Sequence, residues 1–177
     1  MRGREEPAKV LYLFDANVHI TASNTYYPID QVPEYWAWVR HQGTTGKIKI
    51  QLEIYEEMLV GRKNDDSLLD WLKEKDNQAA LLLDEAVDVS LVQRVVSDGY
   101  APDLTDSELE EIGRDPFLIA YSLVDQEKRC VVTTEVSKPS KQRQNRKVPD
   151  VCKFFSLECC NPFQVNRALG FHTAWTS

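Results

Sequence analysis

Acidic side chains follow three short apolar runs of this sequence, at places where the strands of a sheet would end. They are Asp15 after residues 10–14, a glutamate cluster after residues 48–50, and Glu135 after residues 130–133. Asp115 and Asp150 stand where helices are expected to begin and could point at the same edge. Ligand sites in parallel α/β sheets lie at the carboxyl ends of the strands, so we expect these carboxylates to approach one another. Such an oxygen-rich site suits Mg²⁺ or Mn²⁺ rather than Zn²⁺.

Converging carboxylates repel one another, so folding them together is costly unless a cation neutralises them. A divalent cation held there could lower the pKa of a bound water and stabilise charge on a phosphodiester during in-line attack. This arrangement is the one that a metal-dependent nuclease needs. The spacing alone leaves a second interpretation open, in which Asp15, Asp115 and Asp150 only cap the helices that follow them.

Helical geometry reduces the number of candidate site residues in the glutamate cluster. Successive residues of a helix turn by about 100°, which places the apolar residues 52, 54, 55, 58 and 59 on one arc. Glu53 points away from that arc and is expected to be solvated, whereas Glu56 and Glu57 flank its two edges. Periodicity does not choose between Glu56 and Glu57.

The elements that must position these acids alternate between strands and helices. Continuous apolar runs predict buried strands at residues 10–14, 48–50 and 130–133, with a further stub near residues 157–160. The main expected helices cover residues 33–41, 51–60, 67–75, 84–98, 106–112, 117–124, 151–155 and 162–169, with Gly61 as a C-cap and Asp115 as an N-cap. This alternation predicts an α/β sandwich with a mostly parallel sheet.

The composition is that of an ordinary globular protein. The chain has 177 residues, a formal charge of −7 and 42% apolar residues, which excludes global disorder and fits one domain over residues 1–177 with a core from about 10 to 170. No apolar run approaches a membrane span, and the first residues do not resemble a secretory signal, so we expect a cytoplasmic protein without a membrane partner. The four cysteines match no zinc motif and are expected to be reduced thiols.

Four segments of the chain resemble the acidic motifs of PIN-domain nucleases. They are Leu13-Phe14-Asp15-Ala16-Asn17, Tyr55-Glu56-Glu57-Met58, Asp115-Pro116-Phe117-Leu118-Ile119-Ala120 and Val148-Pro149-Asp150-Val151-Cys152. The likeness extends from about residue 10 to 170. It is greatest to a bacterial PIN subgroup known mainly as a domain of unknown function, whose members are similar to the toxin ribonucleases of toxin–antitoxin pairs.

The resemblance implies a three-layer α/β/α fold, a Mg²⁺ or Mn²⁺ site and endonucleolytic cleavage of RNA. Carried over by motif, the catalytic acids are Asp15, Glu57, Asp115 and Asp150, with Asp15, Asp115 and Asp150 as metal ligands and Asn17 and Thr133 as polar supports. The resemblance also implies a cognate antitoxin as partner, and a homodimer as the usual assembly. The chain departs from the PIN pattern at the last motif, where Thr133-Thr134-Glu135 precedes a long basic insertion. The fourth acid is therefore Glu135, Asp150 or both.

Two groups of residues suggest contacts with RNA. The loop at residues 137–147 carries five cations, namely Lys138, Lys141, Arg143, Arg146 and Lys147, which offer a local attraction for phosphates or for an acidic antitoxin. The alternative is a solvated, mobile loop. Five aromatic residues could stack on bases, although their spacing favours the core or a dimer interface: Tyr26, Tyr27, Tyr35, Trp36 and Trp38.

The sequence therefore predicts a metal-dependent endoribonuclease, the toxin of a toxin–antitoxin pair. One alternative is a PIN-like module that binds RNA or protein without cutting it. Another is an aspartyl-nucleophile phosphatase, whose opening motif would need an Asp where Asn17 stands. Motifs of P-loop nucleotide hydrolases, dinucleotide-binding proteins and serine hydrolases are absent from the sequence.

Overall fold

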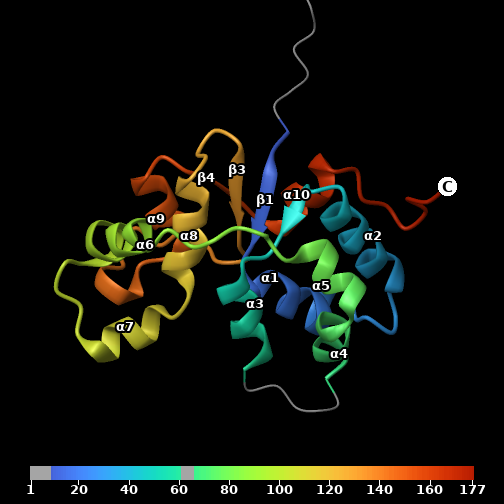
Figure 1. Cartoon of the computed structure of the whole chain (residues 1–177), viewed down its shortest axis with the longest axis horizontal. Coiled ribbons are helices and arrows are strands. Elements are labelled where there is room, and N and C mark those ends of the chain that lie inside the picture. Colours follow the sequence, from blue (N-terminus) through green and yellow to red (C-terminus); the bar gives the residue numbers. More distant parts are fainter. Residues whose placement is uncertain (1–8, 61–65) are drawn as a thin grey trace, which may run out of the picture.

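The apolar runs form a parallel sheet in a computed structural model, which describes residues 9–60 and 66–177. The strands in this part of the chain are β1 (Leu11–Phe14), β2 (Ile48–Lys49), β3 (Arg129–Val132) and β4 (Glu158–Cys160). Their order is β2-β1-β3-β4, and every pairing is parallel. Helices cover both faces, so the fold is the expected three-layer α/β/α sandwich (Figure 1).

The helices form two groups, one on each side of the sheet. Figure 1 shows one group on the side of β4, comprising α6 (Val89–Arg94), α7 (Asp106–Ile112), α8 (Asp115–Leu123) and α9 (Val148–Phe154). The other side carries α1 (Ala16–Thr21), α2 (Pro33–Thr44), α4 (Ser67–Lys73), α5 (Lys75–Leu81) and α10 (Pro162–Ala168), and α3 (Leu52–Leu59) packs against both α1 and α8. Shorter helical turns are η1 (Ala22–Tyr26), η2 (Val95–Tyr100) and η3 (Arg143–Asn145).

The register of the two central strands aligns the residues that follow them. Phe14 of β1 lies opposite Val132 of β3, and both side chains are fully buried. The next residue of each strand, Asp15 and Thr133, therefore emerges at the same edge of the sheet. The Asp15 backbone N–H donates to the Val132 carbonyl at 2.9 Å, which fixes this edge.

Several expected helices have different boundaries in the structure, and two of these differences have a clear local cause. The helix predicted over residues 67–75 ends at Lys73, because the Asn77 side chain donates to the Trp71 carbonyl and a separate helix, α5, starts at Lys75. The helix predicted from residue 84 starts only at Val89, where the Asp88 side chain accepts hydrogen bonds from two backbone N–H groups. The expected C-cap Gly61 lies outside the described residues.

The aromatic cluster of α2 belongs to the core, as its spacing favoured. Tyr35, Trp36 and Trp38 are almost completely buried, whereas Tyr26 at the end of η1 is half exposed. In residues 9–60 and 66–177, no helix has the length and apolar character needed to cross a bilayer.

Candidate functional site

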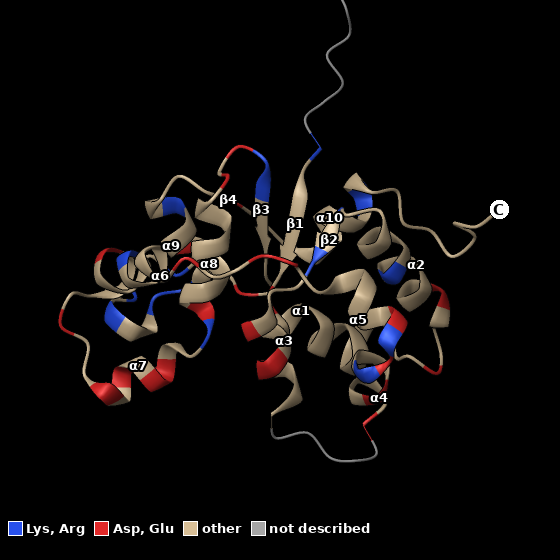
Figure 2. Ribbon diagram, in the orientation of Figure 1, with Lys and Arg blue, Asp and Glu red and all other residues tan. Residues whose placement is uncertain are grey.

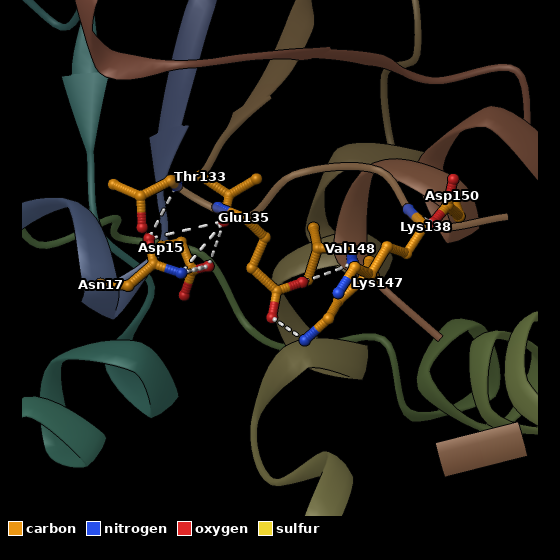
Figure 3. A network of polar contacts seen from close by, with 9 residues as sticks. Asp15, Asn17, Thr133, Glu135, Lys138, Lys147, Val148 and Asp150 are labelled. Carbon is orange, nitrogen blue, oxygen red and sulfur yellow. Dashed lines mark hydrogen bonds and ion pairs between the residues drawn. The ribbon is translucent and has the colours of Figure 1, made fainter. Parts of the chain in front are cut away.

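Asp15 is the most deeply buried acid at the carboxyl edge of the sheet, with 4% of its surface exposed. Its Oδ2 accepts hydrogen bonds from the Thr133 hydroxyl at 2.7 Å and from the Asn17 side-chain amide at 2.6 Å (Figure 3). Asp15 precedes α1, but its side chain makes no capping hydrogen bond of the usual kind. The interpretation of Asp15 as a mere helix cap is therefore not supported.

Asn17 connects the ends of the two central strands. Its amide donates to Asp15 and, at 3.1 Å, to the Thr133 hydroxyl, while its Oδ1 accepts from the Thr134 backbone N–H at 3.0 Å. These bonds fix the Asp15 carboxylate against the end of β3. The structure thus brings Asn17 and Thr133 to Asp15, where polar supports were expected.

Asp115 and Glu57 reach the same edge from α8 and α3. Asp115 is the first residue of α8 rather than its N-cap, so the expected cap was wrong: Arg114 occupies that position without a capping side-chain bond. The turn before it contains Gly113 at a φ of +54°, a value that disfavours any other residue. A Cβ on Gly113 would lie 3.4 Å from Glu57 Oε1, an ordinary van der Waals distance, so the backbone conformation rather than lack of space favours glycine here.

The electrostatics show that four acids share this region. Burial, together with the charges of Glu57 and Glu135 and against the opposing effect of the Thr133 hydrogen bond, raises the pKa of Asp15 to about 6. Burial also raises the pKa of Asp115 well above its ordinary value, followed by the charges of Asp15, Glu135 and Glu57. Burial raises the pKa of Glu57, which Arg114 partly offsets.

Glu135 and Asp150 differ in their surroundings. Glu135 adds its charge to those around Asp15 and Asp115, and its carboxylate accepts from the Val148 backbone N–H at 2.8 Å and pairs with Lys147 at 3.4 Å. Asp150 is buried, and its two oxygens accept from the Ser137 hydroxyl and the Lys138 backbone N–H. In Figure 3, Asp150 lies at the far end of this network from Asp15, with Glu135 between them.

The basic loop at residues 137–147 is folded onto acidic neighbours. Arg143 forms ion pairs with Asp103 and Glu108 at 2.8 Å each, which ties the loop to the acidic helix α7 (Figure 2). Arg146 donates to the Gly99 carbonyl, and Lys147 pairs with Glu135. The side chains of Lys138 and Lys141 are exposed. Of the five cations expected to meet phosphates, three are therefore already engaged within the protein.

Two residues near the site differ from expectation or were not foreseen. Glu53 is partly buried rather than solvated, and its carboxylate interacts with the Tyr121 hydroxyl, whose pKa burial and this contact raise to about 12. The Tyr100 hydroxyl is buried without a hydrogen-bond partner in the described part of the chain. Burial and the charges of Asp115, Glu135 and Asp15 raise the pKa of Tyr100. The sequence around Tyr100 gave no sign of this position, because the residue comes close to the acids only when η2 is folded.

The carboxylates at this edge of the sheet provide the kind of ligand atom that a hard divalent cation binds. Carboxylate oxygens are the ligands that Mg²⁺ and Mn²⁺ prefer, and a bound cation would offset the burial and the carboxylate repulsion that raise the pKa values of Asp15 and Asp115. Among residues 9–60 and 66–177, however, no three acidic, histidine or cysteine side chains stand as a preformed metal-binding group. Glu135 is instead drawn towards Lys147 and Val148.

A comparison with protein families finds one match over most of the chain. The model described as "Domain of unknown function (DUF4411)" matches residues 12–173, which includes every residue of the acidic edge. No curated protein and no solved structure matches the chain.

Proposed function

The chain belongs to the DUF4411 family, and we propose that it is a metal-dependent endoribonuclease that hydrolyses RNA phosphodiester bonds. One observation carries the proposal: Asp15, Glu57, Asp115 and Glu135 come from four separate segments and approach one edge of the sheet, where the charges of Glu57 and Glu135 add to burial in raising the pKa values of Asp15 and Asp115. Burying acids together is unfavourable, and active sites are where such arrangements are concentrated. The resemblance of the surrounding motifs to those of PIN-domain nucleases supports the same activity.

Asp15 and Asp115 are the residues that would hold Mg²⁺ or Mn²⁺, and Glu57 and Glu135 would complete its surroundings. When bound, such a cation supplies an activated water and charge stabilisation for the phosphodiester. Asn17 and Thr133 keep Asp15 in place, because both donate to its Oδ2. Glu135 would have to leave Lys147 to take part, so side-chain rotation at Glu135 is part of the proposal.

We take Glu135 as the fourth acid in place of Asp150. Glu135 interacts electrostatically with Asp15 and Asp115, whereas both oxygens of Asp150 are engaged by the start of the basic loop. In this assignment Asp150 is a positioning residue that holds residues 137–138 against α9. It acts on the reaction only through the loop.

Toxin function is the biological part of the proposal. The resemblance to toxin ribonucleases supports a cytoplasmic toxin that forms a homodimer and is inhibited by a cognate antitoxin protein. The exposed cations Lys138 and Lys141 are available to an acidic antitoxin as well as to RNA. A binding module without cleavage is the competing function, and the lack of a preformed metal-binding group among the described residues favours it.

The first experiment is cleavage of a mixed RNA pool by the purified protein, with Mn²⁺, with EDTA, and with the Asp15→Asn variant. We expect cleavage that needs the metal and is lost in the variant. Glu57→Gln should also abolish cleavage, whereas Glu56→Gln, one residue away on the exposed side of α3, is the matched control and should retain it. Equal cleavage by Asp15→Asn would show that the site is wrong or the activity a contaminant.

A second comparison decides the fourth acid. Glu135→Gln should remove cleavage while leaving the melting temperature close to that of the wild type. Asp150→Asn should lower the melting temperature, because it weakens the bonds to Ser137 and Lys138, and should retain part of the cleavage. Full cleavage by Glu135→Gln together with none by folded Asp150→Asn would reverse the assignment. RNA binding without cleavage by any of these proteins would instead favour the binding module.

A further inference from the structure

A cleft opens beside the acidic edge, on the side of β4. Its volume is about 430 Å³, within the range of small-molecule sites. Thr133 and Glu135 line it together with residues of η1 and of the start of α10. The cleft is therefore continuous with the proposed reaction site and is not a separate hollow of the surface.

An aromatic pair forms one wall of this cleft. The rings of Tyr26 and Phe163 meet edge to face, with centroids 4.9 Å apart and planes at 86°. Their exposed fractions are 50% and 36%, although large aromatic side chains are usually covered when nothing binds them. Because only an edge of one ring covers the other, the pair leaves ring surface available for stacking with a flat ligand.

Two carboxamides lie next to the aromatic pair. Asn161 and Gln164 form the capping box of α10, in which each side-chain oxygen accepts from the backbone N–H of the other residue, at 2.9 Å in both cases. This leaves their NH₂ groups as hydrogen-bond donors at the rim of the cleft. Carboxamides beside an aromatic surface are a common means of recognising the edge of a stacked base.

The charge of the cleft disfavours a phosphate as its occupant. In the described part of the chain, no lysine or arginine lines the cleft, and its one charged wall residue is Glu135. A phosphate would meet repulsion there, whereas an uncharged planar group would not. The occupant is therefore flat, neutral and able to accept hydrogen bonds.

We propose that this cleft binds one unpaired nucleobase of the RNA, next to the phosphate that reaches the acidic edge. The inference rests on the proposed ribonuclease function and deepens it, since a base stacked on Tyr26 and Phe163 must first leave any duplex. The substrate class is accordingly single-stranded or looped RNA. A duplex without an unpaired nucleotide would be a poor substrate.

The test uses the Asp15→Asn protein, which we expect to bind RNA without cutting it, and fluorescence anisotropy with a short labelled single strand. Tyr26→Ala and Phe163→Ala should each weaken binding by about tenfold, the scale of one stacked base. Tyr26→Phe keeps the ring and should bind like its parent. Phe154→Ala removes an equally exposed aromatic residue outside the cleft and is the matched control, with no loss expected.

RNA strands with one abasic nucleotide sharpen the test. One abasic position should weaken binding to the parent protein about tenfold and should have no further effect on Tyr26→Ala, because that variant has already lost the stack. Equal affinities of parent and alanine variants would overturn the base site, and metal-dependent cleavage by the wild type would leave the ribonuclease proposal standing. A failure of the wild type to cut or bind RNA would instead reject the proposed function itself. If the alanine variants bound RNA normally but lost binding to a protein partner, the cleft would be a protein-docking surface and the base site would be overturned.

Discussion

At the scale of single residues, Asp115 couples stability to function. Its pKa is raised well above the ordinary value by burial and by Asp15, Glu135 and Glu57. Because the unfolded chain releases this proton at lower pH than the folded protein does, the folded protein loses stability as the pH rises above the ordinary value of 3.8. The negative charge that would attract a cation therefore also lowers the stability of the folded protein.

The resulting prediction concerns Asp115→Asn. The variant should be more stable than the wild type at pH 7, and its cleavage should fall by about a hundredfold, the scale of losing one electrostatic group of an active site. Mn²⁺ should stabilise the wild type more than the variant. Chemical denaturation at several pH values and with Mn²⁺ measures these differences. A variant less stable than the wild type at neutral pH would contradict the assignment of strain to this acid.

His19 makes a second prediction at this scale, independent of the reaction. Its ring is 2% exposed among Phe14, Trp36 and Trp71, and burial lowers its pKa from 6.5 to about 4. The unfolded chain binds a proton at higher pH than the folded protein, so this contribution is complete above pH 6.5 and is lost as the pH falls towards 4. At about 1.4 kcal/mol per pKa unit, the loss approaches roughly 3 kcal/mol.

We expect His19→Leu to remove this part of the acid sensitivity. Its two ring nitrogens have no hydrogen-bond partner in the described structure, so an apolar replacement sacrifices no polar contact. Between pH 4 and pH 7, the unfolding free energy of the wild type should fall more steeply with decreasing pH than that of the variant. His172→Leu, at an exposed histidine, provides the control and should keep the wild-type dependence.

At the scale of elements, the sequence indicated the strands better than the site. β1 and β3 each contain an apolar run with a well-defined end, and burial leaves few alternatives for such a run, whereas β4 is only partly buried. The break at Glu74 was not predictable from periodicity, because it depends on Asn77 reaching back to the Trp71 carbonyl. The choice between Glu135 and Asp150 was equally open, since it depends on how the basic loop folds against α7 and α9.

The turn between α7 and α8 yields the prediction at this scale. Gly113→Ala should cost about 1–3 kcal/mol, because alanine is strained at a φ of +54°. It should also lower cleavage, since a backbone shift that relieves this strain would displace Asp115, two residues further along the chain. Gly170→Ala, at a φ of +68° with open space around it, is the control that carries strain without touching the site. Unchanged cleavage by Gly113→Ala would show that this turn does not position the acids.

At the scale of the whole molecule, the proposed RNA substrate would meet a chain of net charge −7. Acidic residues are concentrated along α7 (Figure 2), and Arg143 of the basic loop pairs with Glu108 of this helix. The loop is therefore partly neutralised by the protein itself, and Lys138 and Lys141 are its exposed cations. The five basic residues of this loop therefore overstate the number of exposed cations that the folded surface offers to phosphates.

The salt dependence of RNA binding measures this difference. For single strands, each neutralised phosphate contributes about −0.7 to the slope of log affinity against log salt, so two cations predict about −1.4 and five predict about −3.5. We expect the smaller slope for Asp15→Asn binding a short RNA. Lys138→Ala and Lys141→Ala should each reduce it by about 0.7, while Arg143→Ala, whose guanidinium is occupied by Asp103 and Glu108, should leave it unchanged. A slope near −3.5 would mean that the loop releases α7 to bind RNA. In that case the ion pairs of Arg143 would be a closed state that the substrate opens.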